Sequence, residues 1–294
     1  MSRTKVQRSR ETIAAALASP IWKGFETMKV QDGVQFWPEE ESRKHMSRTT
    51  QDTNGGHADK RVAVITGATG GIGSAVAKAL SGAGYQLVLS GRSTSKLNAL
   101  AATMQTASVV VAGDLQDSAL PHLLLSTALE SFGRCDVCLN NGGILEVGQI
   151  QDIDIDRVCE MVRVNVEAAF RVTYAFLKHF VSQRTGHLIN VSSVLGKKVR
   201  STAGAYAGTK HAIEALSEAL RMELSKTDVQ VSCIEPGLIR TGLHDGWEIH
   251  PTQLMGISEP LLPDDIARMI LFLLQQPSHV RIPQLMILPK GHEI

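Results

Sequence analysis

From about residue 60 onward, short apolar runs alternate with longer stretches in which apolar and polar residues mix at helical spacing. The apolar runs read RVAVITG, QLVLSGR, SVVVAGD, CDVCLNN, GHLINVSS, VQVSCIEPG and QLMILP. Continuous apolar strands separated by helices are typical of βαβ units, whose parallel sheet is covered on both faces. Because crossovers between parallel strands are right-handed, the pattern predicts an α/β fold with a doubly wound, parallel seven-stranded sheet and helices on both faces.

Residues 1–58 follow a different pattern and predict an N-terminal extension. Ser9 is a candidate cap for a short helix through Ala18, and KVQDGVQFWP is typical of a small hairpin. Residues 38–58 are polar and predict a linker. The sequence MSRT occurs at both Met1 and Met46, so the true start stays open. We expect residues 59–294 to form the catalytic domain.

Composition narrows the class of protein. Hydrophobic residues make up 43% of the 294 residues, enough for a full core, and the net charge of +1 gives no electrostatic reason to expect a nucleic-acid partner. No apolar run reaches the roughly 18 residues that span a bilayer. The apolar run at residues 13–18 is shorter than the core of a secretory signal. These observations predict a cytoplasmic protein without a membrane partner.

Cys135 and Cys138 form a C-x-x-C pair, which raises the possibility of a redox or metal site. They lie in a predicted buried strand, where residues i and i+3 point to opposite faces. The sequence has no second cysteine pair at metal-ligand spacing. We therefore expect packed thiols and no metal site.

A glycine-rich turn, VITGATGGIG, joins the first predicted strand to the first helix. Gly67, Gly71 and Gly73 suit a tight turn, a close approach of backbone to pyrophosphate, and close packing of helix on strand. The spacing differs from G-x-G-x-x-G, and glycines can also serve packing alone. Their place between a strand and a helix favours a nucleotide site in a Rossmann-like fold.

The end of the second strand indicates which nucleotide binds. An NAD site usually has an acidic residue there for the ribose hydroxyls, whereas this chain has Arg92 and Ser93. A guanidinium can bind a 2′-phosphate with two hydrogen bonds, and a hydroxyl can add another. The alternative is that Arg92 is only a solvated loop charge. The pattern favours NADP(H) as cofactor.

Tyr206 and Lys210 in YAGTK lie one helical turn apart, so their side chains share a helix face. A lysine beside a phenol in a cleft lowers the pKa of the phenol and suits it to act as a general acid. Ser193 ends the predicted strand HLINVSS, at the sheet edge where ligands of doubly wound folds bind. Each residue alone has an ordinary packing explanation, but together they predict proton transfer to a carbonyl.

Over about residues 60–290 the chain resembles the short-chain dehydrogenases/reductases. The matching pieces are TGATGGIG, GDL, NNGG, VNVEAAF, Ser193, YAGTK and PGLIRT, in the family's order. The resemblance implies a catalytic set of Asn165, Ser193, Tyr206 and Lys210, with Asn165 holding a water that links Lys210 to solvent. One departure is that the family's usual N-N-A-G is N-N-G-G here, with Gly142 in place of alanine.

The resemblance also implies roles in cofactor binding. Asp114 would contact the adenine side, Asn141 would support the cofactor-binding strand, and Ile239 would offer backbone contact to the carboxamide. The full set that we expect at the cofactor is Gly67, Thr69, Gly71, Ile72, Gly73, Arg92, Ser93, Asp114, Leu115, Asn141, Gly142, Tyr206, Lys210, Pro236, Gly237, Ile239 and Thr241.

The predicted activity is NADP(H)-dependent interconversion of a carbonyl and a secondary alcohol on a small-molecule substrate. The ending HVRIPQLMILP resembles that of family members that act on hydroxy acids, which implies a hydroxy acid or keto acid as the substrate. Residues 242–262 form a short substrate segment with His244, Trp247 and His250. Lys197, Lys198 and Arg200 follow Ser193, where they could attract a carboxylate, although solvated loop charges are the more common case. The alternative hypothesis is a non-catalytic NADP-binding sensor or interaction protein that uses residues 1–58.

Two predicted helices have more apolar surface than one sheet face can cover. The residues concerned are Ala168, Phe170, Val172, Ala175, Phe176, Phe180, Ala212, Leu216 and Leu220. Exposed apolar surface of this size usually marks an interface. Together with the family resemblance, it predicts a homo-oligomer, a dimer or more specifically a tetramer.

Overall fold

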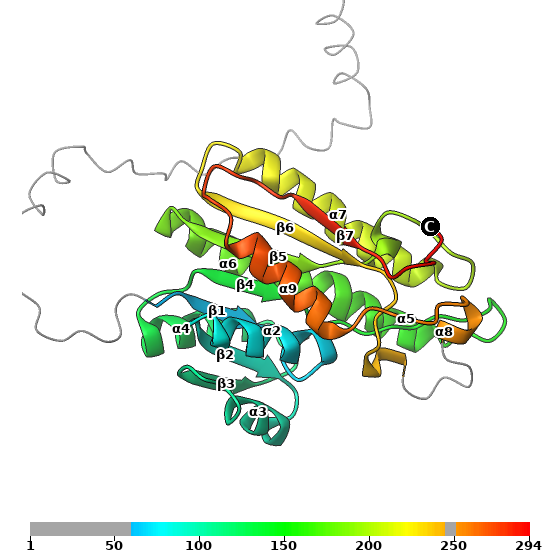
Figure 1. Ribbon diagram of the computed structural model, residues 1–294, viewed down its shortest axis with the longest axis horizontal. Coiled ribbons are helices and arrows are strands. Elements are labelled where there is room, and N and C mark those ends of the chain that lie inside the picture. Colours follow the sequence, from blue (N-terminus) through cyan, green and yellow to red (C-terminus); the bar gives the residue numbers. More distant parts are fainter. Residues whose placement is uncertain (1–59, 245–250) are drawn as a thin grey trace, which may run out of the picture. The chain divides into compact units, whose positions relative to one another are not determined.

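Seven parallel strands form one sheet in the computed structural model, which describes residues 60–244 and 251–294. The strands are β1 (Val62–Ile65), β2 (Gln86–Gly91), β3 (Ser108–Ala112), β4 (Val137–Asn140), β5 (Gly186–Val191), β6 (Val229–Pro236) and β7 (Gln284–Ile287). Their order is β3-β2-β1-β4-β5-β6-β7, as Figure 1 shows, and each neighbouring pair is parallel. The predicted Rossmann-like sheet is therefore confirmed. The order reverses between β1 and β4, where doubly wound folds bind their ligands.

Helices cover both faces of this sheet. The described helices are α2 (Gly71–Gly82), α3 (Thr94–Ala101), α4 (Leu120–Phe132), α5 (Ile155–Val162), α6 (Ala169–Gln183), α7 (Gly204–Glu223), α8 (Pro251–Leu254) and α9 (Pro263–Leu274), with a π-helical turn η2 (Arg163–Ala168) and 3₁₀ turns η3 (Val194–Gly196) and η4 (Gly242–His244). One apolar core lies between the sheet and α2, α3 and α9. A second core lies between the opposite face and α4, α6 and α7. Figure 1 shows α5 and α8 at one end of the strands.

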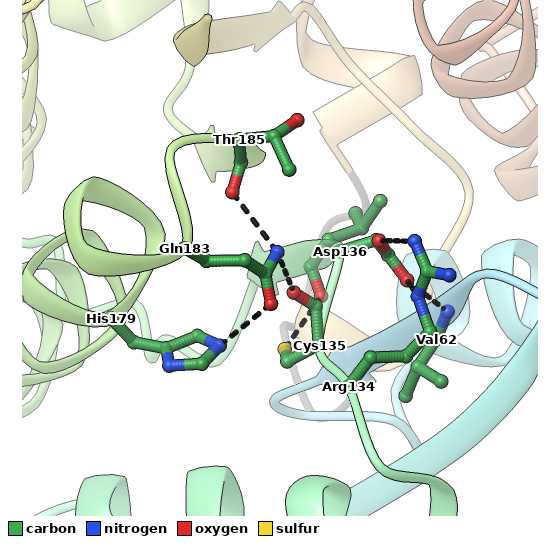
Figure 2. A network of polar contacts seen from close by, with 8 residues as sticks. Val62, Arg134, Cys135, Asp136, His179, Gln183 and Thr185 are labelled. Carbon is green, nitrogen blue, oxygen red and sulfur yellow. Dashed lines mark hydrogen bonds and ion pairs between the residues drawn. The ribbon is translucent and has the colours of Figure 1, made fainter. Parts of the chain in front are cut away.

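A polar network, shown in Figure 2, ties elements together at the amino ends of β1 and β4. The Asp136 carboxylate accepts a hydrogen bond from the backbone N–H of Val62 at 2.8 Å and pairs with both Nε and Nη2 of Arg134. The Gln183 amide donates to the carbonyls of Cys135 and Thr185. These bonds join the start of β1, the start of β4 and the end of α6. They therefore hold the amino-terminal ends of these two central strands together.

The apolar surplus predicted on α6 and α7 is largely a wrong prediction. Six of the nine residues are buried within the chain's own core: Ala168, Val172, Ala175, Phe176, Phe180 and Leu220. Phe170, Ala212 and Leu216 are only partly exposed. The reason is that both helices lie on the same sheet face and bury their apolar sides there, which stabilises the fold by roughly 1.5–3 kcal/mol for each large side chain. These residues no longer support the predicted oligomer.

All four cysteines lie in the described residues and all are free thiols. Cys135, Cys138 and Cys233 are buried, and burial raises the pKa of each thiol above its usual value. Cys159, on α5, is exposed. The thiols of the C-x-x-C pair are therefore packed in the core, as predicted, and residues 60–244 and 251–294 contain no group of His, Cys, Asp or Glu side chains suited to a metal ion.

The predicted helix, hairpin and linker of residues 1–58, and the substrate candidates Trp247 and His250, lie outside the described residues. Within the part of the chain that the structure describes, no helix is both long and apolar enough to cross a bilayer.

Candidate active site

A cleft of about 1140 Å³ opens at the carboxyl ends of the strands. It is lined by the glycine turn after β1, by the segments that follow β2 to β6, and by the first turns of α7. Every site residue predicted from the sequence lines this cleft except Gly73, Ser93 and Asn165. Those three do not line it, and each has a structural task described below.

The glycine turn needs its glycines for different reasons. Gly67 has a φ of +62°, a left-handed conformation that other residues rarely adopt. A Cβ on Gly73 would lie 2.3 Å from the carbonyl oxygen of Gly67, so only glycine lets α2 start this close to the turn. No side chain caps α2, and its first turn carries no acidic residue. A bare helix N-terminus that faces a cleft suits the negative charge of a pyrophosphate, so these residues fit the expected cofactor.

Thr66, which the sequence reasoning overlooked, holds the glycine turn against the loop after β4. Its Oγ1 accepts hydrogen bonds from the backbone N–H groups of Asn141 at 3.0 Å and Gly142 at 3.1 Å. In return the Asn141 amide donates to the carbonyls of Thr66 and Gly67. The position of Thr66 directly before the first glycine of the turn, in the sequence ITG, is the feature that could have identified it. Asn141 thus holds the segment that follows β1, and its role at a cofactor stays a prediction.

The departure from N-N-A-G has a local explanation. A Cβ on Gly142 would lie 2.3 Å from Cδ1 of Leu115. Leu115 thus fills the space that an alanine side chain would need, and the two residues meet in the cleft wall. An alanine at position 142 would require the flexible side chain of Leu115 to shift, and the glycine removes no polar group from the site.

Two cations line the cleft beyond the end of β2. Arg92 is exposed there, and Lys96, which was not singled out from the sequence, lies one turn later in α3. Ser93 has a different task, because its Oγ accepts a hydrogen bond from the N–H of Lys96 and caps α3. Asp114 lines the same region, and its carboxylate accepts from the N–H of Gln116. This end of the cleft is therefore positively charged where an NAD site would carry an acid.

Tyr206 and Ser193 meet at the opposite end. Tyr206 lies in the first turn of α7, and Ser193 precedes η3, whose first turn it caps through the N–H of Leu195. Removal from water raises the pKa of the Tyr206 hydroxyl to about 12, although a side-chain hydrogen bond with Ser193 lowers it in part. The sequence predicts that Lys210 lowers the pKa of this phenol, but in the structure of the protein alone this pKa is raised. The phenol is protonated at neutral pH and can donate.

Lys210 lies beside the tyrosine but is oriented by the backbone. Its Nζ is 5.7 Å from the centre of the Tyr206 ring and donates to the carbonyl of Val191 at 2.9 Å. Burial lowers the pKa of the ammonium to about 8, against the opposing influence of Cys233 and Glu214. The lysine is thus still mostly charged at pH 7, close enough to favour negative charge on the phenol oxygen as it forms.

Asn165 stands in the π-helical turn η2, a geometry often found at functional sites. Its side chain accepts from the N–H of Ile144 at 2.9 Å and donates to the carbonyl of the same residue at 2.8 Å. It also donates to Thr209, next to Lys210 in α7. Asn165 therefore holds the loop after β4 against α7, the helix that carries Tyr206.

The cations after Ser193 have separate surroundings. Lys197 pairs with Glu214 at 3.1 Å and Glu235 at 3.8 Å, so it is not available to a substrate. Lys198 is exposed and does not line the cleft, whereas Arg200 does. Of the three predicted candidates for a substrate carboxylate, the structure retains Arg200 alone.

The pair of carboxylates around Lys197 predicts a pH-dependent stability. Burial and the nearby Glu214 raise the pKa of Glu235 from 4.5 to about 7. The contribution of Glu235 to the free energy of unfolding is therefore complete below about pH 4.5, where its carboxyl is protonated in both the folded and the unfolded state. This contribution is lost as the pH rises through 7, because the buried carboxyl must then ionise. We expect Glu235→Gln to remove this loss, which amounts to up to about 3 kcal/mol in the free energy of unfolding. Urea unfolding at pH 5 and pH 8 measures it.

Glu218→Gln, which changes an exposed residue of the same helix as Glu214, is the matched control and should leave the pH dependence unchanged. A Glu235→Gln protein that loses as much stability as wild type between the two pH values would contradict the assignment.

Comparison with known proteins identifies the family. The model of the short chain dehydrogenase family matches residues 61–250. An uncharacterized oxidoreductase of Staphylococcus epidermidis is 34% identical over 230 residues, which cover 78% of this chain and 97% of that protein. A relative from Staphylococcus aureus is equally similar, at 34% identity over 230 residues.

Solved structures agree with this result. An alcohol dehydrogenase from the archaeon Thermococcus sibiricus, in complex with 5-hydroxy-NADP, is 28% identical with a TM-score of 0.71, over 80% of this chain and 99% of that one. A 3-ketoacyl-(acyl-carrier-protein) reductase from Brucella melitensis, in complex with NADH, is 26% identical with a TM-score of 0.71, over 77% and 96%. The chain belongs to the short chain dehydrogenase family and is an oxidoreductase that uses a nicotinamide cofactor.

Proposed function

We propose that this protein is an NADP(H)-dependent oxidoreductase that interconverts a carbonyl and a secondary alcohol on a hydroxy acid or keto acid. The observation that carries the proposal is the cleft itself, with uncapped α2 in its middle, cations at one end and Tyr206 with Ser193 at the other. The intact catalytic set argues against the alternative of a non-catalytic sensor, which has no need of a proton donor.

The chain's own residues then have distinct tasks in the reaction. The bound nicotinamide supplies or accepts the hydride. Ser193 donates a hydrogen bond to the substrate oxygen and holds it at the Tyr206 hydroxyl. Tyr206 gives its proton to that oxygen during reduction and removes it during oxidation. Lys210 stabilises the phenolate, and Asn165 keeps the cleft wall in place and holds the water through which Lys210 exchanges protons.

The remaining site residues hold the cofactor. Gly67, Gly71 and Ile72 offer backbone N–H groups to the phosphates, and Thr69 adds a hydroxyl. Asp114, Leu115 and Gly142 border the adenosine. The nicotinamide side is formed by the segment after β6, with Pro236, Gly237, Ile239 and Thr241, all of which line the cleft.

The proposal predicts a preference for NADP(H) over NAD(H). A charge-assisted hydrogen bond is worth about 1.5–3 kcal/mol, so Arg92→Ala should weaken NADP(H) binding by roughly 10- to 100-fold and leave NAD(H) nearly unchanged. Values of kcat/KM with both nucleotides test this. Arg184→Ala, away from the cleft, is the control, and a wild type that prefers NAD(H) would refute the assignment.

The activity is tested by following NADPH absorbance with a panel of oxo acids and neutral ketones. Reduction of at least one carbonyl compound is the expected result, and binding of NADPH without any turnover across the panel would favour the sensor. Cytoplasmic location stays a prediction from the sequence, and a homodimer or homotetramer stays a prediction from the family resemblance alone. The same holds for residues 1–58, which we expect to be dispensable for the chemistry.

A further inference from the structure

The segment after β7 returns to the cleft and places a histidine on its wall. His292 lines the cleft together with Gly237, the residue after β6. A Cβ on Gly237 would lie 2.5 Å from Nδ1 and 2.9 Å from Cε1 of this imidazole. The ring therefore rests directly on the glycine backbone at the nicotinamide end, and any larger residue at position 237 would push it away.

The hydrogen bond of this imidazole decides where its proton lies. Nδ1 accepts from the backbone N–H of Leu238 at 3.3 Å, which requires a lone pair on Nδ1. Burial and the nearby charge of Arg200 lower the pKa of His292, so the ring is neutral at pH 7. A neutral imidazole with Nδ1 as acceptor carries its proton on Nε2.

This Nε2–H donor has no partner among the described residues, although it is shielded from water. An unsatisfied buried donor is costly, and one on a cleft wall is the kind of group that a ligand oxygen satisfies. The neighbouring Gly291 and Glu293 are exposed. Because His292 itself lines the cleft, its Nε2–H is a donor that a ligand oxygen in the cleft would satisfy.

Arg200 supplies the charge beside this donor. It lines the same cleft, and its Nη1 contacts only the weak acceptor Sδ of Met255, at 3.2 Å. Among the described residues no carboxylate forms an ion pair with it. By contrast Arg157, another cation of the cleft, is paired with Glu146 at 2.8 Å. Arg200 is thus a cation at the catalytic end that lacks a protein counter-ion.

We propose that Arg200 and His292 together bind the carboxylate of the substrate, opposite Tyr206. A guanidinium and a neutral N–H offer donors and one positive charge, which match a singly charged acceptor. A phosphate, with nearly two negative charges, fits less well, because Glu160 also lines this cleft. The inference rests on the proposed oxidoreductase activity and identifies which residues select an oxo acid over a neutral ketone.

The test compares acetoacetate with its uncharged methyl ester. We expect wild type to prefer the acid. Arg200→Gln and His292→Phe should each lower kcat/KM for acetoacetate by roughly 10- to 100-fold, mainly through KM, and change the value for the ester by less than about threefold. Arg200→Lys should recover part of the loss. Lys198→Gln, an exposed cation of the same loop that lies off the cleft, is the control.

Calorimetric titration of acetoacetate into the NADP⁺ complex gives a readout that does not depend on turnover. We expect Arg200→Gln to weaken this binding at least tenfold. A wild type that reduces acid and ester equally well, with Arg200→Gln affecting neither, would overturn the carboxylate subsite and leave the reductase activity standing. A wild type that binds acetoacetate but reduces neither compound would refute the proposed reaction and leave the subsite standing.

Discussion

Tyr206→Phe should reduce kcat by about 10²- to 10⁴-fold, the range that a general acid usually contributes. The substitution removes only the hydroxyl, so the ring still fills its place in the first turn of α7. The pKa of the hydroxyl is raised to about 12, so the proton is present throughout the pH range in which the activity would be measured. The loss should therefore be a loss of the proton donor and not a shift of the pH optimum.

NADPH fluorescence titration separates chemistry from binding in this variant, and the dissociation constant should change by less than about threefold. Tyr174→Phe is the control, because Tyr174 is an exposed residue of α6 that lies off the cleft. A Tyr206→Phe enzyme that keeps more than about a tenth of wild-type kcat would contradict the assignment of the acid.

Gly73→Ala should abolish most cofactor binding, with a loss on the order of 100-fold in affinity for NADPH. The added Cβ would lie 2.3 Å from the carbonyl oxygen of Gly67 and 2.9 Å from Cα of Ala68. Neither neighbour is a flexible side chain, so the backbone of the turn must move. A displaced turn no longer presents its N–H groups to the phosphates at hydrogen-bonding distance.

The control for this variant lies in the same helix. Gly82→Ala adds the same methyl group at the end of α2, where the nearest atom, Nε2 of Gln105, is 4.0 Å away. It should bind NADPH like wild type. Equal affinity in both variants would mean that the Gly73 contact does not control the phosphate turn, and circular dichroism would establish that both proteins are folded.

The sheet could be predicted from sequence because its signal is local. Each strand is a short apolar run bounded by polar or glycine residues. Each stretch of sequence between two such runs is long enough to form a helix. The glycine turn, Ser193, Tyr206 and Lys210 were predictable for a related reason. In a parallel sheet, residues that follow the strands meet at one edge, whatever the details of packing.

The remaining features depend on contacts between residues far apart in the chain. Helices α6 and α7 have apolar sides in sequence, but nothing local tells whether the sheet or a second subunit covers them. Lys197 looks like a free loop cation until β6 brings Glu235 beside it. His292 lies 55 residues after Gly237 in sequence and carries no motif, so only the return of the chain after β7 reveals its place.

Cys159 gives the protein a built-in attachment point for a reporter group. The other three cysteines are buried and their thiols are held in the protonated, unreactive form, whereas Cys159 is exposed on α5. Its neighbours Arg157 and Glu160 line the cleft. A thiol-directed fluorophore on the unaltered sequence should therefore label a single position, on the helix whose Arg157 and Glu160 line the cleft, and a change in its emission would report movement of α5 when cofactor or substrate binds.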